Sequence, residues 1–287
     1  MNTFKPNGII TLTTDFGLDD PYVAIMKGVV LGIAPHATIV DYTHGVEPGN
    51  IPQAAHLLRS GCQYFPPGTV HVVVVDPGVG SDRRAVAIET PAWTFVGPDN
   101  GVLALATQDA QQTWGRQVRM IELTNERFWR SSLSATFHGR DLFAPIAAHI
   151  AAGVQFDTLG RPLDALVPAG MQVVQCLGDG LLRGQIVHID RFGNCITNIT
   201  RDDLAHYEIG EQVVVEIIDQ QIAGLVRTYA DALPGRLTCL IGSGGNVEIA
   251  VPNGNAAAML GVGIGDKLRV RRIEARDEGS GTSEVGR

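Results

Sequence analysis

Three segments of the chain place a charged or titratable side chain beside glycines, which let the backbone pass close to a ligand. They are centred on Asp15, Asp76 and His138. A carboxylate beside a ligand can accept hydrogen bonds from sugar hydroxyls or pair with a cation. A histidine can transfer a proton or hold a water molecule. These residue types point to a small-molecule site with acid–base chemistry.

Asp15 lies in T-T-D-F-G, directly after a predicted strand. Open α/β folds bind ligands at the carboxyl ends of their strands, so this position favours a ligand contact. The alternative interpretation is that Asp15 caps the helix that follows it.

Asp76 opens D-P-G-V-G after the most hydrophobic predicted strand, and Arg83 and Arg84 follow it. A guanidinium at this spacing can fold back onto the carboxylate and form an ion pair. A turn with a surface salt bridge is the alternative interpretation of this segment.

His138 lies in F-H-G-R-D, just before a predicted helix, where it could act as an acid, a base or a water-holding group. In the alternative interpretation Asp141 caps the helix and His138 is incidental. A further motif, G-P-D-N-G at residues 97–101, contains an Asn-Gly pair and predicts a structural turn.

A metal site is the obvious competitor, because Asp76, Asp99, His138 and Asp141 are all of metal-ligand type. No H-x-H, H-E-x-x-H or D-x-D pair occurs around them, and arginines lie beside them. We therefore expect neither a catalytic metal nor another cofactor.

The elements that must position these residues alternate between strand and helix in the first half of the chain. The predicted strands are 8–13, 38–41, 70–75, 86–89 and 94–96, and the predicted helices are 21–32, 51–60 and 143–152. Such alternation predicts an α/β domain with a mainly parallel central sheet.

The second half has a different character. Residues 157–181 are rich in glycine and proline and are typical of a linker, and short strands separated by turns follow, with one possible helix at 256–260. We predict an α/β domain over 1–165, a smaller all-β barrel over 166–273 and a disordered tail over 274–287. Within the barrel, D-R-F-G-N at 190–194 ends a strand and G-S-G-G-N at 242–246 forms a glycine-rich loop.

Composition narrows the class of protein. The net charge of −8 argues against a general nucleic-acid binder, since little would offset the phosphate charge. No apolar run approaches the length of a membrane span, the first residues do not resemble a signal peptide, and the four cysteines form no C-x-x-C pair. We expect a cytoplasmic protein with reduced thiols.

Six motifs occur in a fixed order between residues 8 and 272: T-T-D-F-G, D-P-G-V-G-x-x-R-R, G-P-D-N-G, F-H-G-R-D, D-x-F-G-N and S-G-G-N-V-E-I-A-V-P-N-G-N-A-A. Together they resemble the S-adenosyl-L-methionine hydrolase (adenosine-forming) family, which is related to fluorinases and chlorinases. The resemblance implies an α/β domain followed by a β-barrel domain. It also implies homotrimers with sites between subunits, and attack of water on ribose C5′ to release adenosine and L-methionine.

The resemblance also implies roles for individual residues. The set that distinguishes hydrolases from halogenases matches Asp76, Arg83 and His138, although Arg84 beside Arg83 leaves the choice of arginine open. Asp15 is similar to the partner of the ribose hydroxyls, Asp190 and Ser243 to the groups that hold the methionine end, and Asn194 to the adenine partner. The remaining candidate substrate contacts are Phe192, Tyr229, Glu248, Val251 and Ala256.

Two other functions remain open at this point. A halide-using relative would form a 5′-halo-5′-deoxyadenosine, although the intact Asp, Arg and His set argues against it. A non-catalytic protein that binds S-adenosylmethionine or a nucleoside would keep the pocket without turnover.

Overall fold

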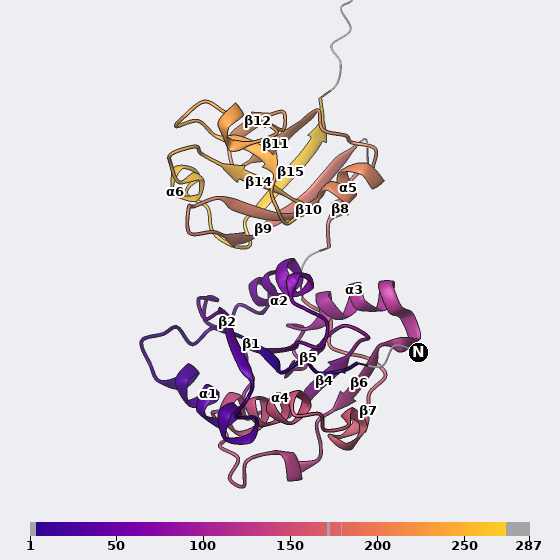
Figure 1. Cartoon of the computed structure of the whole chain (residues 1–287). Coiled ribbons are helices and arrows are strands. Elements are labelled where there is room, and N and C mark those ends of the chain that lie inside the picture. The colour runs from indigo at the N-terminus through magenta and orange to yellow at the C-terminus, as the bar shows by residue number, and fades with distance from the viewer. Residues whose placement is uncertain (1–3, 171–172, 179, 274–287) are drawn as a thin grey trace, which may run out of the picture. The chain divides into compact units, whose positions relative to one another are not determined.

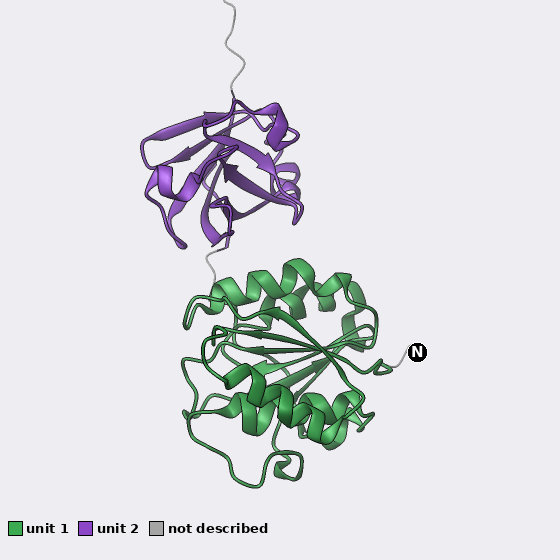
Figure 2. Ribbon diagram, turned by 60° about the vertical axis from the view of Figure 1, so that its left-hand side comes forward, with its two compact units in different colours: residues 1–171 green, residues 172–287 purple. Residues whose placement is uncertain are grey.

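The structure is a computed structural model that describes residues 4–170, 173–178 and 180–273. The chain forms two compact units, unit 1 over Met1–Met171 and unit 2 over Gln172–Arg287 (Figure 2). The predicted disordered tail, 274–287, lies outside the described residues.

Unit 1 has the predicted α/β architecture. Its sheet has the strand order β2-β1-β3-β5-β4-β6-β7, and the neighbours from β2 through β5 pair in parallel, as expected for a mainly parallel sheet (Figure 1). The strands are β1 (Ile9–Thr14), β2 (Thr38–Thr43), β3 (Val70–Val74), β4 (Ala85–Glu89), β5 (Thr94–Pro98), β6 (Arg119–Glu122) and β7 (Arg161–Pro162). The helices are α1 (Tyr22–Ile33), α2 (Ile51–Gly61), α3 (Ala104–Trp114) and α4 (Ala144–Ala151).

Helices cover both faces of this sheet (Figure 2). Residues of α1 and α4 share one apolar cluster with Ile10, Leu12 and Val72, while residues of α2 and α3 share another with Val73 and Phe95. Alternate residues of a strand point to opposite faces, so a strand that helices cover on both faces is buried along its whole length. This explains why β3 is entirely buried.

Register brings two predicted site residues to one edge of the sheet. Thr14 at the end of β1 pairs with Val74 at the end of β3. Asp15 follows Thr14 directly, and Asp76 follows Val74 by two residues. Both carboxylates therefore lie where the carboxyl ends of parallel strands meet.

The linker predicted over 157–181 is wrong for the part up to residue 170. Arg161–Pro162 forms β7 and pairs with β6, and Leu163 and Leu166 pack against the core beside α2 and α3. Gly and Pro here mark turns on the surface of unit 1 rather than a free connection.

Besides β7, helix α3 and strand β6 of unit 1 are absent from the predicted elements. The buried face of α3 consists of Ala106, Thr107 and Ala110, so the helix lacks the stripe of large apolar residues that periodicity detects. The predicted helix at 143–152 also begins differently, because a π-helical turn at Gly139–Phe143 precedes α4.

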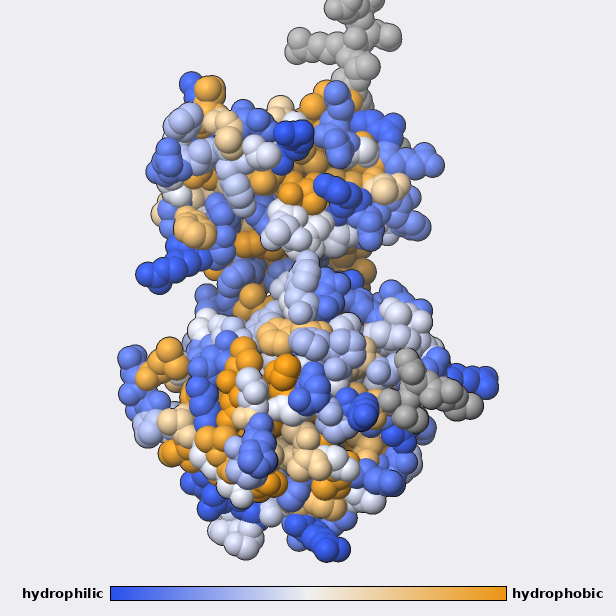
Figure 3. Space-filling view, viewed as in Figure 1, coloured by the Kyte–Doolittle hydropathy of each residue, from blue (hydrophilic) through white to orange (hydrophobic). Residues whose placement is uncertain are grey.

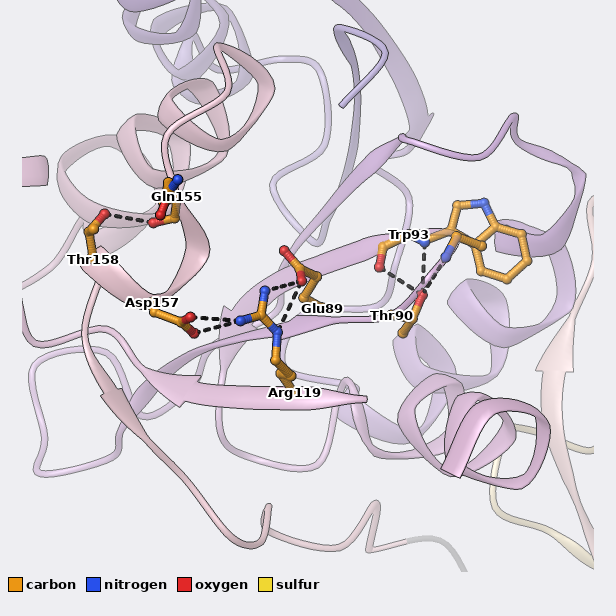
Figure 4. A network of polar contacts seen from close by, with 8 residues as sticks. Glu89, Thr90, Trp93, Arg119, Gln155, Asp157 and Thr158 are labelled. Carbon is orange, nitrogen blue, oxygen red and sulfur yellow. Dashed lines mark hydrogen bonds and ion pairs between the residues drawn. The ribbon is translucent and has the colours of Figure 1, made fainter. Parts of the chain in front are cut away.

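An ion-pair network lies where β4 ends and the neighbouring strand β6 begins (Figure 4). Arg119 pairs with Glu89, and its Nη1 lies 2.7 Å from Asp157 Oδ2 in the short 3₁₀ helix Phe156–Thr158. Burial raises the pKa of Glu89, although the nearby guanidinium works in the opposite direction. The network ties this 3₁₀ helix to the sheet.

Unit 2 is the predicted all-β barrel. Its antiparallel path runs β12-β11-β15-β9-β10-β14-β13, β8 pairs with β9, and a bridge between Val226 and Leu240 nearly closes the path. The strands are β8 (Gln175–Cys176), β9 (Leu181–Ile189), β10 (Cys195–Thr200), β11 (Val213–Ile217), β12 (Gln220–Ala223), β13 (Thr238–Ile241), β14 (Asn246–Ala250) and β15 (Lys267–Arg272). The predicted helix is present as α6 (Ala256–Leu260), and a second helix, α5 (Arg201–His206), begins at a capping box that sequence analysis missed.

The surface of unit 1 is not uniformly polar. Figure 3 shows apolar side chains gathered around α1, and the large apolar residues exposed there are Leu18, Tyr22, Ile25 and Leu31. Within the described residues, no helix is long and apolar enough to cross a membrane. All four cysteines are free thiols, and only Cys176 is exposed.

Candidate active site

Asp76, Arg83 and His138 form one contact group in unit 1. Arg83 Nε lies 3.0 Å from both carboxylate oxygens of Asp76, and Arg83 Nη2 lies 2.5 Å from Asp76 Oδ2 and 2.6 Å from His138 Nδ1. The Asp76 and Arg83 side chains are 5% and 10% exposed, so this is a largely buried pair rather than a surface salt bridge. The hydrogen bonds that Arg83 donates to Asp76 and His138 fix all three side chains relative to one another.

The contact with Arg83 determines the tautomer of the neutral His138 ring. An arginine can only donate, so Nδ1 accepts its hydrogen bond and the neutral ring carries its hydrogen on Nε2. Burial lowers the pKa of His138, and the charge of Arg83 lowers it further, whereas Asp76 and Asp141 oppose the shift. The neutral imidazole is therefore favoured at neutral pH.

A buried carboxylate supports the segment that carries His138. Asp141 is fully buried, pairs with Arg140 and accepts a hydrogen bond from the backbone of Ser134 at 2.8 Å. Burial raises the pKa of Asp141, but these partners outweigh it and hold the pKa below its usual value. Asp141 therefore does not cap the helix as in the alternative interpretation, and the ring of His138 has a specific partner in Arg83.

Asp15 lines a cavity together with Asp76 and His138. Its Oδ2 accepts a hydrogen bond from the backbone of Gly49 at 2.8 Å. Pro21, not Asp15, stands at the N-terminus of α1, so the capping interpretation is wrong. The cavity measures about 380 Å³, and its lining includes Asp15, Asp76 and His138.

The two neighbouring arginines have different partners. Arg84 pairs with Asp99, whose side chain is 1% exposed, and its Nη2 donates to the backbone oxygen of Ala165. Asp99 also accepts a hydrogen bond from the backbone of Val167. Arg84 thus fastens the end of unit 1, and Arg83 is the arginine that meets Asp76.

Unit 2 contains a second cavity of about 790 Å³. Five of the predicted substrate residues line it: Asp190, Phe192, Asn194, Tyr229 and Val251. Asp190 Oδ1 accepts from the backbones of Phe192 and Asn194, and its Oδ2 accepts from the Asn194 side chain at 3.0 Å. The turn is thereby folded around the carboxylate, while Phe192 is 76% exposed.

The remaining predicted residues of unit 2, Ser243, Glu248 and Ala256, are not among the lining residues of this cavity. Tyr229 donates to Glu248 Oε2 at 2.9 Å. Burial raises the pKa of Glu248, and burial together with the nearby carboxylates raises that of Tyr229 to about 12. Ala256 is buried at the start of α6, and Ser243 is exposed in the turn before β14.

Sequence analysis missed several lining residues of the first cavity, including Gly49, Thr136 and Phe137. Gly49 contributes only its backbone, so no residue type could have revealed it. Phe137 forms edge-to-face contacts with Phe16 and Tyr22, and its place as the first residue of F-H-G-R-D was the available signal. In the described part of the chain, no three side chains of His, Cys, Asp or Glu are grouped so that they could hold a metal ion.

Comparison with known proteins identifies the family. The model of the SAM hydroxide adenosyltransferase N-terminal domain matches residues 10–160, and that of its C-terminal domain matches residues 184–269. The chain belongs to this family. It is 38% identical to a protein of Salinispora tropica named (R)-S-adenosyl-L-methionine hydrolase, over 92% of this chain and 98% of the relative. The family predicted from the six motifs is therefore confirmed.

More distant and structural relatives agree with this placement. A fluorinase of an Actinoplanes species is 29% identical over 79% of this chain and 84% of its own. The crystal structure of an uncharacterized conserved protein from Thermotoga maritima superposes with a TM-score of 0.82 at 35% identity, covering 92% of this chain and all of that one. The predicted fold class is confirmed as well.

Proposed function

We propose that this protein hydrolyses S-adenosyl-L-methionine, with water attacking ribose C5′ to give adenosine and L-methionine. This is the activity for which its curated relatives are named. The observation that carries the proposal is the buried contact of Arg83 with Asp76 and His138, two residues that line one cavity together with Asp15.

The substrate needs little chemical activation by the protein. Its sulfonium is a good leaving group that departs as a neutral thioether, so the protein must mainly orient a water and exclude bulk solvent. Arg83 holds Asp76 and His138 in place, and the Nε2 hydrogen of His138 orients the water. His138 Nδ1 already accepts from Arg83, so Asp76 takes the proton as the bond from oxygen to C5′ forms and the bond from C5′ to sulfur breaks.

The remaining predicted residues bind the substrate. Asp15 accepts hydrogen bonds from the ribose hydroxyls. In unit 2, Phe192 and Tyr229 stack on the adenine and Asn194 contacts its edge. Asp190 and Ser243 hold the methionine end, and Glu248, Val251 and Ala256 complete the site. The supporting observation is that five of these residues line one cavity.

The relatives' names support a proposal about the substrate epimer. A sulfonium with three different substituents is a stereocentre, and the curated relatives are named for the (R) form. We propose that this chain also acts on the (R) epimer. Supplying the two epimers separately tests this, since only the (R) form should be consumed.

We further propose that the protein is a cytoplasmic homotrimer whose sites combine unit 1 of one subunit with unit 2 of the next, and that it binds no nucleic acid. The exposed apolar residues around α1 support an assembly that covers them. The division of the candidate residues between two units supports shared sites.

Chromatography of the purified protein with S-adenosylmethionine tests the activity. Equal amounts of adenosine and methionine, in the presence or absence of chloride or fluoride, are expected. A 5′-halo-5′-deoxyadenosine would instead support the halide-using alternative. Binding without any product would support the non-catalytic alternative.

A further inference from the structure

A chain of hydrogen bonds runs behind the turn that carries Asp15, and none of its members has a role in the proposed reaction. Lys27 on α1 lies 2.7 Å from Asp41 Oδ2 on β2, and Asp41 Oδ1 lies 2.9 Å from His44 Nε2. His44 Nδ1 lies 2.8 Å from the hydroxyl of Thr14, which also accepts a hydrogen bond from the backbone of Phe16. The chain thus leads from the surface of unit 1 to both neighbours of Asp15.

The chemistry of Asp41 fixes the direction of these hydrogen bonds. Burial raises the pKa of Asp41, but hydrogen bonds from His44 and Lys27 outweigh it and leave the pKa below its usual value. An ionised carboxylate only accepts, so His44 Nε2 carries a hydrogen, and in the neutral form of the ring Nδ1 is then an acceptor. The hydroxyl of Thr14 must then donate to Nδ1, which orients its lone pairs toward the Phe16 amide.

His44 also holds the other end of the turn. The backbone amide of Gly17 donates to the backbone oxygen of His44 at 2.9 Å, and Gly17 has a φ of 64°, which favours glycine. The Asp15–Phe16 pair is therefore tied to His44 on both sides. His44 itself is only 6% exposed and cannot easily exchange these partners for water.

The turn leaves one oxygen of Asp15 available. The backbone amide of Gly49 donates to Oδ2, and within the described residues no hydrogen bond to Oδ1 is present. A carboxylate with one oxygen fixed by the protein and the other free is suited to a ligand hydroxyl, provided that the backbone beneath it cannot shift.

We propose that His44 is a positioning residue that sets the carboxylate of Asp15 and thereby gives the site its selectivity for a ribose with free hydroxyls. This rests on the proposed function, in which Asp15 binds those hydroxyls. His44 does not touch the substrate. Its side chain acts through the hydroxyl of Thr14, and its backbone oxygen holds the amide of Gly17.

Calorimetric titration of the full-length protein with adenosine and with 2′,3′-dideoxyadenosine tests this, because the ratio of the two Kd values does not depend on the fraction of folded protein. The wild type should prefer adenosine by roughly 10²-fold, the value of two hydrogen bonds to a charged group. Asp15→Ala should abolish the preference. His44→Ala should reduce it by about fivefold or more while leaving the Kd of the dideoxynucleoside within about twofold.

Two further variants keep the result interpretable. Thr14→Val removes the hydroxyl with little change of shape, so it should also reduce the preference even if His44→Ala folds poorly. His149→Ala, a half-buried histidine on α4 outside the chain, should keep the wild-type ratio.

A wild-type ratio in both His44→Ala and Thr14→Val, or equal weakening of both ligands, would overturn the proposal. A wild-type ratio in Asp15→Ala would overturn it together with the ribose assignment. If instead the variants behave as expected but no adenosine forms from S-adenosylmethionine, the positioning role stands and only the proposed hydrolysis fails.

Discussion

Arg83 and Arg84 are neighbours in the chain just before β4, but their side chains have partners on opposite sides of the strand. They lead directly into β4, where successive side chains point in opposite directions. One therefore reaches Asp76 and His138 and the other reaches Asp99. The spacing of Asp76 and Arg83 predicted the ion pair, but residue types alone could not choose between two adjacent arginines, since that choice depends on the pleat of the strand.

This difference allows a matched test at the level of residues. Asp76→Asn, Arg83→Ala and His138→Ala should each lower kcat by about 10²-fold or more, because each removes one group that orients or deprotonates the water. Steady-state kinetics measures this, and circular dichroism checks that each variant is folded.

Arg84→Ala is the control. It should keep kcat within about threefold but reduce the free energy of unfolding by roughly 1–2 kcal/mol, because it leaves the buried Asp99 without its cation. Equal losses of kcat in Arg83→Ala and Arg84→Ala would contradict the assignment of Arg83 to the site.

At the level of elements, short turns rather than helices and strands determine the site. Strand and helix positions were predictable where the apolar pattern is strong, as in β3 and α1. The π-helical turn after His138 and the packing of α6 on the 190–194 turn were not, because they depend on contacts between segments distant in the sequence. Gly193 shows this, since its φ is 82° and a Cβ on it would lie 2.1 Å from Cγ of Asn255 at the start of α6.

Gly193→Ala should therefore weaken adenosine binding by roughly tenfold, because the methyl group must push the start of α6 away from Asp190 and Asn194. Gly224→Ala is a matched control, since Gly224 also has a positive φ, of 78°, but no heavy atom would lie within 4 Å of its Cβ. Titration calorimetry measures both. An unchanged affinity in Gly193→Ala would show that this packing does not shape the adenine site.

At the level of the whole molecule, a buried histidine makes the stability of unit 1 depend on pH. His71 on β3 is fully buried, bonds to the hydroxyl of Thr11 at 2.8 Å and stacks on Phe95. Burial lowers its pKa to about 3. Between pH 6.5 and about 3 the unfolded chain therefore binds a proton that the folded chain excludes, so stability falls as the pH falls.

The double variant Thr11→Val, His71→Leu should lose less stability on acidification than the wild type. The difference should approach about 1.4 kcal/mol per pH unit in this range. Urea unfolding at several pH values, followed by tryptophan fluorescence, measures it in unit 1 alone, because Trp93, Trp114 and Trp129 all lie there. Parallel pH profiles for the two proteins would contradict this prediction.

The sequence motifs predicted which candidate site residues lie in each unit. They do not determine how units from different subunits come together. If sites are shared in a trimer, inactive Asp76→Asn and Asp190→Ala subunits should regain activity when they are unfolded and refolded together. Some sites would then receive an intact half from each variant. No recovery, together with a monomeric mass in light scattering, would show that each site is built within one chain.

If water attacks C5′, an oxygen atom of the solvent must end up in the adenosine that is formed. The protein is incubated with S-adenosylmethionine in water enriched in oxygen-18, and the products are analysed by mass spectrometry. The account predicts one solvent oxygen on the 5′ carbon of adenosine, none in methionine, and loss of this product in Asp76→Asn. Adenosine without the label, or a halogenated nucleoside as the main product, would contradict it.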